Sequence, residues 1–241
     1  MSRLNDLPLR RLQFYVTTQY PCGYLPEQQA RSLTAIPANL IDTVAYSELV
    51  RMGFRRSGSY TYRPHCDQCQ ACVPVRIKVD DFVPNRSQKR AQKQHANLEV
   101  YMLPLVFSAE HFQLYSQYQK RRHGGGGMDN DDSEQYRSFL MQSQVDTVLV
   151  EFREDGVLRM VGVMDRLTDG LSAVYAFYDA EMEKASYGTY NVLWLIECCR
   201  QLGLPHLYLG YWIAQARKMS YKKEFQPMQG FINDIWQPLP A

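Results

Sequence analysis

Residues 170–213 read GLSAVYAFYDAEMEKASYGTYNVLWLIECCRQLGLPHLYLGYWI, and this stretch decides the fold. Residues 172–178 and 206–213 are short runs rich in aromatic and aliphatic side chains, which is typical of strands. Between them, residues 188–202 form an apolar segment of helical length that ends at Gly203. The stretch therefore predicts a strand, a helix and a second strand in succession.

The chain on both sides of this unit is regular from residue 98 onward. Sequence patterns predict a strand at 98–107, helices at 108–122 and 134–142, strands at 147–153 and 158–165, a helix at 215–225 and a last strand at 229–236. The resulting order of elements resembles that of the GNAT acyltransferase fold. In that fold the sheet opens between its fourth and fifth strands and holds an activated acyl group beside an acceptor amine. Here those strands carry residues 175–179 and 208–212.

The first 97 residues are irregular and rich in turns. They predict strands at 12–20, 59–63 and 73–79, a helix at 40–51 and an exposed basic helix from residue 86. We interpret 59–63 and 73–79 as a hairpin whose connection holds three cysteines. A glycine run at 124–127, followed by acidic residues, predicts a loop. The predicted fold class is α+β, with a GNAT-like acyltransferase core at 98–241 and an irregular, cysteine-containing N-terminal region at 1–97 packed on it.

Composition is that of an ordinary folded protein. Hydrophobic residues make up 45% and charged residues 22% of the 241 residues, unlike a disordered chain. No apolar run approaches the roughly 20 residues that cross a bilayer, and the N-terminus lacks the apolar segment of a signal peptide. We therefore expect a cytoplasmic protein with no membrane partner, whose six cysteines are reduced.

Charge is distributed unevenly along the chain, although the net charge is only +2. Residues 51–100 carry ten Lys and Arg against four Asp and Glu, whereas residues 101–190 carry eight against fourteen. A local excess of this size is typical of a solvated basic face and equally of a surface that meets a polyanion. Charge alone favours neither interpretation.

Three cysteines stand at two-residue spacing in HCDQCQAC, residues 65–72. Thiols spaced in this way can converge on one zinc ion or iron–sulfur cluster, which normally takes four ligands. Cys22, His65 or another residue would supply the fourth ligand. The alternative is a tight turn of small, half-buried residues with no metal bound. The predicted metal ligands are Cys22, Cys66, Cys69 and Cys72.

Arginines alternate with Ser, Gln and aromatic residues in the basic part of the chain. Arg55 and Arg56 lie beside the Ser57-Gly58 turn. Arginine is a planar, bidentate donor to phosphate and carboxylate, and aromatic rings stack on unpaired bases such as the end of a tRNA. We therefore expect Arg55 and Arg56 to be exposed anion-binding residues. The alternative is a hairpin with solvated arginines.

Two features in the second half of the chain are of the kind that binds an anion. The apolar helix starts after SYGTYN, residues 186–191, where free backbone N–H groups favour a phosphate or a developing negative charge; the alternative is simple helix capping. Lys218 and Lys222 lie four residues apart and would share one helix face, either as anion-binding groups or as solvated lysines.

Six separated motifs carry a resemblance over nearly the whole chain. They are CGYL at 22–25, GFRRSG at 53–58, YRPHCDQCQAC at 62–72, RSQKR at 86–90, YGTYNVLW at 187–194, and YLGYWI at 208–213 with KMSYK at 218–222. Together they resemble the arginyl-tRNA–protein transferase family, most closely its bacterial branch of aspartate/glutamate leucyltransferases. Eukaryotic members have a second cysteine in the first motif where this chain has Leu25. This departure weakens the transfer of their metal-cluster chemistry to this chain, although Cys22, Cys66, Cys69 and Cys72 could still supply four thiolates.

The resemblance implies an aminoacyltransferase. Leucine would pass from leucyl-tRNA, the co-substrate, to the α-amine of proteins or peptides that begin with Asp or Glu. The new N-terminus would mark these proteins for degradation through an N-degron pathway. The chemistry itself requires no cofactor, because an aminoacyl ester is already activated.

The site has to align the neutral acceptor amine with the ester carbonyl, stabilise the oxyanion and accept a proton. We predict that Asp179, Tyr178 and Tyr211 handle protons, and that Arg76 and Lys218 bind the carboxylate of the acceptor. The residues predicted to bind the tRNA or its aminoacyl end are Arg55, Arg56, Tyr187, Gly188, Thr189, Asn191 and Lys222.

Two alternative functions belong to other classes. A coenzyme-A-dependent GNAT N-acetyltransferase would share the fold, but would show a Gly-rich pyrophosphate loop before the third helix, where only Gly188 stands. A non-catalytic, metal-stabilised RNA-binding protein would explain the first half of the chain and leave the second half without a role.

Overall fold

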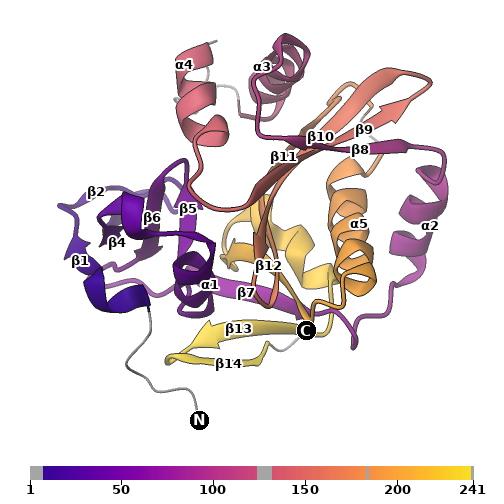
Figure 1. The fold of residues 1–241 in the computed structure, drawn as a ribbon. Coiled ribbons are helices and arrows are strands. Elements are labelled where there is room, and N and C mark those ends of the chain that lie inside the picture. Colours follow the sequence, from indigo (N-terminus) through magenta and orange to yellow (C-terminus); the bar gives the residue numbers. More distant parts are fainter. Residues whose placement is uncertain (1–7, 124–131, 183–184, 240–241) are drawn as a thin grey trace.

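A mixed sheet forms the centre of the protein (Figure 1). The computed structural model describes residues 8–123, 132–182 and 185–239. The sheet strands are β7 Val73–Lys78, β8 Glu99–Pro104, β9 Thr147–Glu154, β10 Val157–Leu167, β11 Gly170–Tyr178, β12 His206–Trp212, β13 Met228–Ile232 and β14 Ile235–Pro238. Their order across the sheet is β14-β13-β7-β12-β11-β10-β9-β8. β11 and β12 run parallel, whereas the other described neighbours are antiparallel.

Helices cover both faces of this sheet. The helical segments are α1 Thr43–Arg51, α2 Arg86–Gln94, α3 Ala109–His123, α4 Ser133–Tyr136, α5 Tyr187–Gln201, the π-helical turn η4 Arg137–Met141, and the 3-10 segments η2 Pro8–Arg11, η3 Ala38–Leu40 and η5 Arg217–Glu224. Side chains alternate between the two faces along a strand. Met160 and Met164 of β10 accordingly pack in the core beneath α5, and Val161 and Val163 pack in the core that includes α3. The fold class is α+β, as the sequence predicted.

A second sheet lies beside the first and belongs to the N-terminal region (Figure 1). Its strands are β1 Gln13–Val16, β4 Ser32–Ile36, β6 Tyr60–Pro64 and β5 Arg55–Ser57, in that order, and a short ladder joins β2 Tyr20–Pro21 to β3 Gln29–Ala30. A third core joins this region to the large sheet. It packs Tyr46, Leu49 and Phe54 against Leu167 of β10 and Tyr208 of β12.

The predicted hairpin of residues 59–63 and 73–79 is wrong. β6 pairs with β4 and β5 in the small sheet, whereas β7 lies between β12 and β13 in the large one. Val75 and Ile77 lie on the same face of β7 and are almost completely buried, and β12 and β13 pair with the two edges of the strand. The division of the chain at residues 97 and 98 stays a prediction, and β7 precedes that point although it completes the large sheet.

The C-terminal elements also differ from the prediction. Residues 229–236 form two strands, because Asn233 and Asp234 adopt positive φ angles of 52° and 60° and turn the chain back on itself. The segment predicted as a helix at 215–225 is a 3-10 helix. The loop predicted at the glycine run 124–127 lies outside the described residues. In the described parts of the chain, the helices are all too short or too polar to span a bilayer.

Candidate active site

The parallel strands β11 and β12 separate partway along their length. Gly170, Leu171 and Ser172 pair with residues 206–208, and no further pairs join the two described strands. β11 nevertheless continues to Tyr178 and β12 to Trp212. Gly210 has a φ angle of +70° in the stretch where the pairing of β12 with β7 also shifts register. The strands are therefore closed at one end and open at the other.

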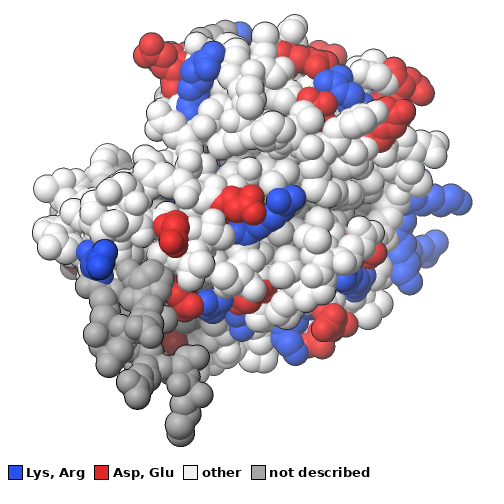
Figure 2. Space-filling model, in the orientation of Figure 1, with Lys and Arg blue, Asp and Glu red and all other residues white. Residues whose placement is uncertain are grey.

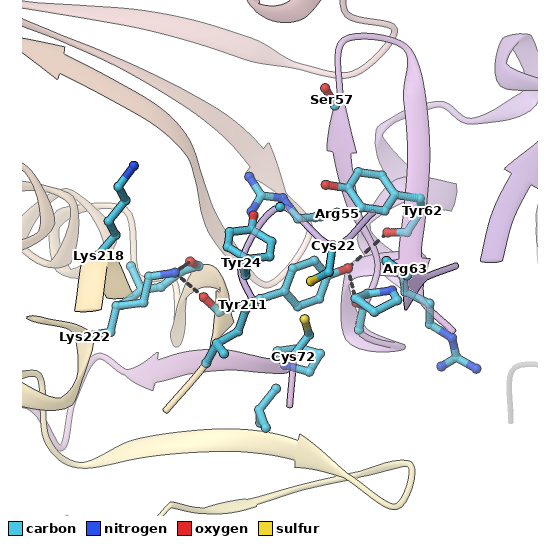
Figure 3. Close-up of a pocket in the computed structure, with 18 of the residues that line it drawn as sticks. Cys22, Tyr24, Arg55, Ser57, Tyr62, Arg63, Cys72, Tyr211, Lys218 and Lys222 are labelled. Atoms are coloured by element: carbon cyan, nitrogen blue, oxygen red, sulfur yellow. Dashed lines mark hydrogen bonds between the residues drawn. The ribbon is translucent and has the colours of Figure 1, made fainter. Parts of the chain in front are cut away.

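A cavity of about 1900 Å³ lies at the open end, and we call it the cleft. Both halves of the chain line it, and Figure 3 shows side chains from the small sheet, β12 and η5 around the same space. Twelve of the predicted site residues line the cleft: Cys22, Arg55, Cys66, Cys69, Cys72, Tyr178, Gly188, Thr189, Asn191, Tyr211, Lys218 and Lys222. The other predicted residues, Arg56, Arg76, Asp179 and Tyr187, are described but lie outside this lining.

Arg55 occupies the gap between the two strands. Its guanidinium lies 3.4 Å from the carbonyl oxygen of Val174, the β11 residue that the register with β10 skips, and 5.7 Å from the ring centroid of Tyr211. A Cβ on Gly210 would lie 3.1 Å from the Arg55 Nη1 atom, so the glycine leaves room for the guanidinium. Arg55 thus binds backbone where a strand-to-strand hydrogen bond would otherwise lie.

Lys222 acts in the same way on β12. Its side chain is 6% exposed, and Nζ donates hydrogen bonds to the carbonyl oxygens of Leu209, at 2.8 Å, and Tyr211. Burial, together with the positive charge of Arg55, lowers the pKa of Lys222 to about 7. The open end therefore holds two cationic side chains whose hydrogen bonds go to neutral carbonyls.

The three residues predicted to handle protons have different surroundings. The hydroxyl of Tyr211 donates to the carbonyl oxygens of Gly53 and Tyr62, at 3.1 and 3.2 Å, and so ties the small sheet to β12. Asp179 pairs with Arg159 at 3.0 Å, outside the cleft lining. Tyr178 lines the cleft, and its hydroxyl accepts a hydrogen bond from the Arg122 guanidinium at 2.7 Å.

The start of α5 forms another part of the wall. Ser186 precedes it in a left-handed conformation, with φ of 55°, and makes no side-chain capping bond. Gly188 and Thr189 of the first turn line the cleft, whereas Tyr187 is buried and stacks on His95 at 4.6 Å between ring centroids. The uncapped first turn leaves backbone N–H groups available to an anion.

The four predicted metal ligands all line the cleft, and Figure 3 shows the sulfurs of Cys22 and Cys72 pointing toward each other. Burial, and then the neighbouring thiols of Cys22, Cys66 and Cys69, raises the pKa of Cys72 to about 12. Among the described residues, however, no three His, Cys, Asp or Glu side chains are arranged to hold one metal ion. That these four cysteines bind one metal stays a prediction.

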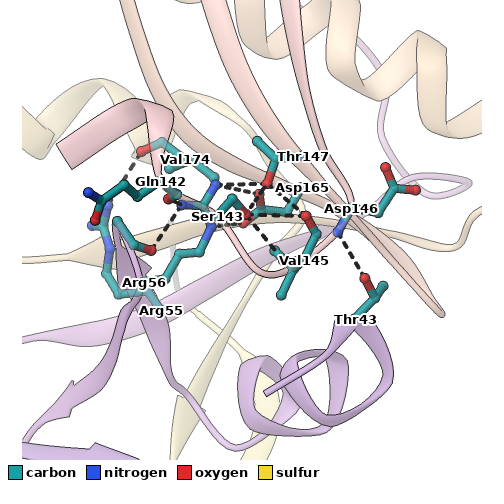
Figure 4. Close-up of polar contacts among 11 residues, drawn as sticks. Thr43, Arg55, Arg56, Gln142, Ser143, Val145, Asp146, Thr147, Asp165 and Val174 are labelled. Carbon is teal, nitrogen blue, oxygen red and sulfur yellow. Dashed lines mark hydrogen bonds and ion pairs between the residues drawn. The ribbon is translucent and has the colours of Figure 1, made fainter. Parts of the chain in front are cut away.

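Arg56 is not the exposed residue that the sequence predicted. Its side chain is 3% exposed and binds Asp165 through Nε at 2.8 Å and Nη2 at 2.7 Å (Figure 4). Nη2 also donates to the hydroxyl of Thr147 at 3.0 Å. Neighbouring side chains on a strand point to opposite sides, so β5 sends Arg55 into the cleft and Arg56 into the core.

Arg76 lies at the closed end rather than in the cleft lining. Its guanidinium sits 4.4 Å from a Trp236 ring centroid, and it donates to Gln229 at 2.8 Å and to the Tyr208 hydroxyl at 3.3 Å. The side chain therefore fills a polar site between β7, β12 and the C-terminal hairpin.

Some lining residues were missed by the sequence analysis. Tyr24, Tyr62, Arg122 and Tyr221 all border the cleft. Tyr24 belongs to the CGYL motif and Tyr221 to KMSYK, so their motifs were noted without a role for these side chains. Arg122 carried no signal beyond its place near the end of a polar helix.

Two family models match the chain. The model described as "Arginine-tRNA-protein transferase, N terminus" matches residues 20–90, and the one described as "Arginine-tRNA-protein transferase, C terminus" matches residues 110–232. The chain belongs to the arginine-tRNA-protein transferase family. Members of the family named aspartate/glutamate leucyltransferase are similar over almost their whole length.

The relative from Nitrosospira multiformis is 56% identical over 99% of this chain and 95% of its own length, and that from Methylobacillus flagellatus is 57% identical over 99% and 96%. Among solved structures, the C-terminal domain of a putative lysylphosphatidylglycerol synthetase from Agrobacterium fabrum is similar with a TM-score of 0.44 and 10% identity, over 69% of this chain and 50% of that one.

Proposed function

We propose that the chain transfers leucine from leucyl-tRNA to the α-amine of proteins that begin with Asp or Glu. The observation that carries this proposal is the identity of 56% and 57%, over 99% of the chain, to relatives named aspartate/glutamate leucyltransferase. The GNAT-like arrangement that we propose for the core agrees with it, because the separation of β11 from β12 provides a cleft for an acyl donor and an acceptor amine.

The reaction exchanges an ester for an amide. The nitrogen of the acceptor amine attacks the carbonyl carbon of the leucyl ester, and the bond to the ribose oxygen of the tRNA breaks. One proton leaves the amine and one is taken up by the released ribose hydroxyl, so atoms balance without an oxidant or a reductant. An α-amine has a reference pKa of about 7.7–8.0, so a useful fraction is neutral near pH 7.5. The site therefore has to position the amine beside the ester carbonyl, polarise that carbonyl and move one proton.

We assign proton transfer to Tyr178. It lines the cleft, where its hydroxyl accepts a hydrogen bond from Arg122 and can donate its proton to the departing ribose oxygen. Asp179 and Tyr211 stay predictions for this role, with their side chains bound to Arg159 and to backbone carbonyls respectively.

We assign charge stabilisation to Arg55 and to the first turn of α5. Both face the cleft, and fixed donors that need no reorganisation stabilise a developing oxyanion best. Lys218 also lines the cleft, and we propose that it receives the acceptor carboxylate. Arg76 remains an alternative partner for that carboxylate, although its guanidinium is packed on Trp236.

The chemistry proposed here routes no step through a metal. The prediction that Cys22, Cys66, Cys69 and Cys72 bind zinc or an iron–sulfur cluster is open to elemental analysis and a visible absorption spectrum of protein purified without oxygen. Zinc at about one equivalent, or iron at about two or four equivalents with the absorption of a cluster, that disappears in Cys66→Ser would support the prediction. Absence of both metals would overturn it.

A transfer assay tests the function. The protein is mixed with leucyl-tRNA carrying labelled leucine and with peptides that differ only in beginning with Asp, Asn or Ala. Label should enter the Asp peptide and, far more slowly, the other two. Acetyl transfer from acetyl-coenzyme A would indicate the N-acetyltransferase, and tRNA binding with no label in any peptide would indicate the non-catalytic RNA-binding protein.

A further inference from the structure

A basic face on α2 lies beside the cleft and has no part in the chemistry described above. We propose that this face binds the phosphate backbone of the donor tRNA, directly behind its aminoacyl end. The inference rests on the proposed function, because that function requires the cleft to receive the end of an RNA. The face lies outside the cleft and would contact the phosphate groups of the donor.

The charge on this face is concentrated and unpaired. Arg86, Lys89, Arg90 and Lys93 are all exposed, and none of the four has an ion-pair partner within 4 Å among the described residues. No Asp or Glu occurs between residues 82 and 98. Figure 2 shows Lys and Arg projecting from the edge of the molecule where Figure 1 places α2. Among the residues that the structure describes, these four cations therefore have no carboxylate partner, and their side chains face outward.

The four residues form one stripe. Their spacing of three, one and three residues places them on the same side of a helix, and the stripe is about 10 Å long at 1.5 Å per residue. Lysine and arginine along such a line can neutralise successive phosphates of a nucleic-acid strand. The stripe thus has the length of a short run of backbone rather than of a single bound anion.

The opposite side of α2 fixes the stripe in place. Asn85 and Gln88 form a reciprocal capping box at its start, with bonds of 3.0 and 2.9 Å. The side-chain amide of Gln88 also donates to the Glu224 carbonyl at 2.8 Å, and His95 beyond the last turn is hydrogen-bonded to the Ala185 carbonyl. α2 is therefore anchored to η5 and to the start of α5, both of which border the cleft.

A groove connects the stripe to the cleft. A cavity of about 460 Å³ lies between the two helices, lined by Ser87, Arg90, Ala91 and Gln94 of α2 and by Ser186 and Thr189 at the start of α5. Ser186 and Thr189 also line the cleft. A strand whose terminal ribose lies in the cleft can leave it over the first turn of α5, where backbone N–H groups lack a side-chain cap, and reach Arg90 along the lining of this cavity.

The chemistry of the groove favours RNA backbone over an acidic peptide. Its lining is hydroxyl, amide and guanidinium groups with one alanine, so it has no apolar pocket for the side chains of a peptide. Hydroxyls, amides and cations are the groups that contact phosphate and sugar without reading sequence. The surface should consequently bind the donor regardless of which bases follow its end.

The test compares two sets of three substitutions with the same change in charge. The stripe variant carries Lys89→Gln, Arg90→Gln and Lys93→Gln. The control variant carries Arg11→Gln, Lys78→Gln and Arg166→Gln, which are exposed residues of other surfaces. Each protein is assayed with leucyl-tRNA and with leucyl-adenosine, a donor that reaches the cleft but not α2. Affinity for tRNA is also measured between 50 and 200 mM salt.

The stripe variant should bind tRNA roughly tenfold or more weakly than the control, and the slope of log affinity against log salt should fall by about two to three, since each lost phosphate contact removes close to one unit. Its rate with leucyl-adenosine should match that of the control. Equal tRNA affinity and slope in both variants would overturn the proposal, as would a stripe variant whose only defect is a higher KM for a folded acceptor protein. If the unsubstituted protein transfers leucine from neither donor, the proposed function fails instead, and tRNA binding still decides the role of α2.

Discussion

The two ends of the β11–β12 interface hold similar side chains in opposite electrostatic situations. At the closed end, Arg56 binds Asp165, Arg51 binds Asp169 at 3.2 Å, and the Tyr208 hydroxyl donates to Asp169 at 2.8 Å. At the open end, Arg55 and Lys222 bind carbonyl oxygens, and no ion pair joins either of them to a described carboxylate. The cations of one end are paired with carboxylates, and those of the other end are hydrogen-bonded to neutral carbonyl oxygens.

This difference separates stability from function along a single pair of strands. A cation paired with a buried carboxylate contributes to the fold, and its charge is not available to a ligand. A cation held by carbonyls keeps the strands in place while its charge remains open to an anion in the cleft. Substitutions at the closed end should therefore change the free energy of unfolding, and substitutions at the open end should change transfer.

Arg56→Met should produce the largest effect on stability. The substitution leaves Asp165, which is fully buried, without its charged partner, and breaking such a pair costs about 3–5 kcal/mol. Urea denaturation would measure the loss. The double variant Arg56→Met with Asp165→Leu should recover a large part of it, because no unpaired charge remains. A single variant as stable as the parent protein would contradict the assignment of Arg56 to the closed end.

Arg55 and Arg56 show which property of a strand could not be predicted from the sequence. The GFRRSG motif predicted the same exposed, anion-binding role for both arginines. Nothing in the motif shows which of the two side chains points into the cleft and which points into the core. The separation of the two is a consequence of strand pairing, because β5 pairs with β6, which in turn pairs with β4 in the small sheet.

The same limit explains the wrong hairpin. Apolar spacing at 73–79 predicted a strand correctly, but the partners of β7 come from residues 206–212 and 228–230, more than 125 residues away. A local sequence pattern indicates that a strand is buried, but it does not indicate which strands pair with it. By contrast, residues 170–213 predicted a strand, a helix and a strand, and these appear as β11, α5 and β12, because a local crossover depends on nearby sequence.

Arg55→Met should have the largest effect on transfer. It removes a fixed cation from the cleft, and loss of one preorganised donor of this kind lowers kcat by roughly 10²–10³-fold. The matched control is Arg51→Met at the closed end, which should retain most of the activity and lose stability. Leucyl transfer to an Asp peptide and urea denaturation would be measured for both. If Arg51→Met lost as much transfer as Arg55→Met at equal stability, the two ends would not differ as described.

A smaller effect is expected for recognition of the acceptor. A site that pairs a cation with the acidic side chain leaves that cation unpaired when Asn is offered, so the preference for Asp should be ~100-fold or more. Lys218→Met should reduce this preference through a higher KM for the Asp peptide, with tRNA affinity nearly unchanged. Arg76→Met at the closed end is the comparison. A reduced preference in Arg76→Met alone would assign the carboxylate to that residue instead.

The smallest expected effect is the pH dependence that Lys222 gives to stability. Its pKa is about 7 in the folded protein, because of burial and the charge of Arg55, and about 10.4 in an unfolded chain. Between these values the unfolded state binds more protons, so the free energy of unfolding rises with pH, by at most about 1.4 kcal/mol per pH unit. Below pH 7 both states are protonated and the contribution is constant. Lys222→Met lacks this titration, so the difference in unfolding free energy between parent and variant should be flat from pH 6 to 7 and should then increase toward pH 9 in favour of the parent. If the difference in unfolding free energy stays constant from pH 6 to 9, Lys222 titrates as an ordinary lysine. The burial of Lys222 and the charge of Arg55 would then not lower its pKa.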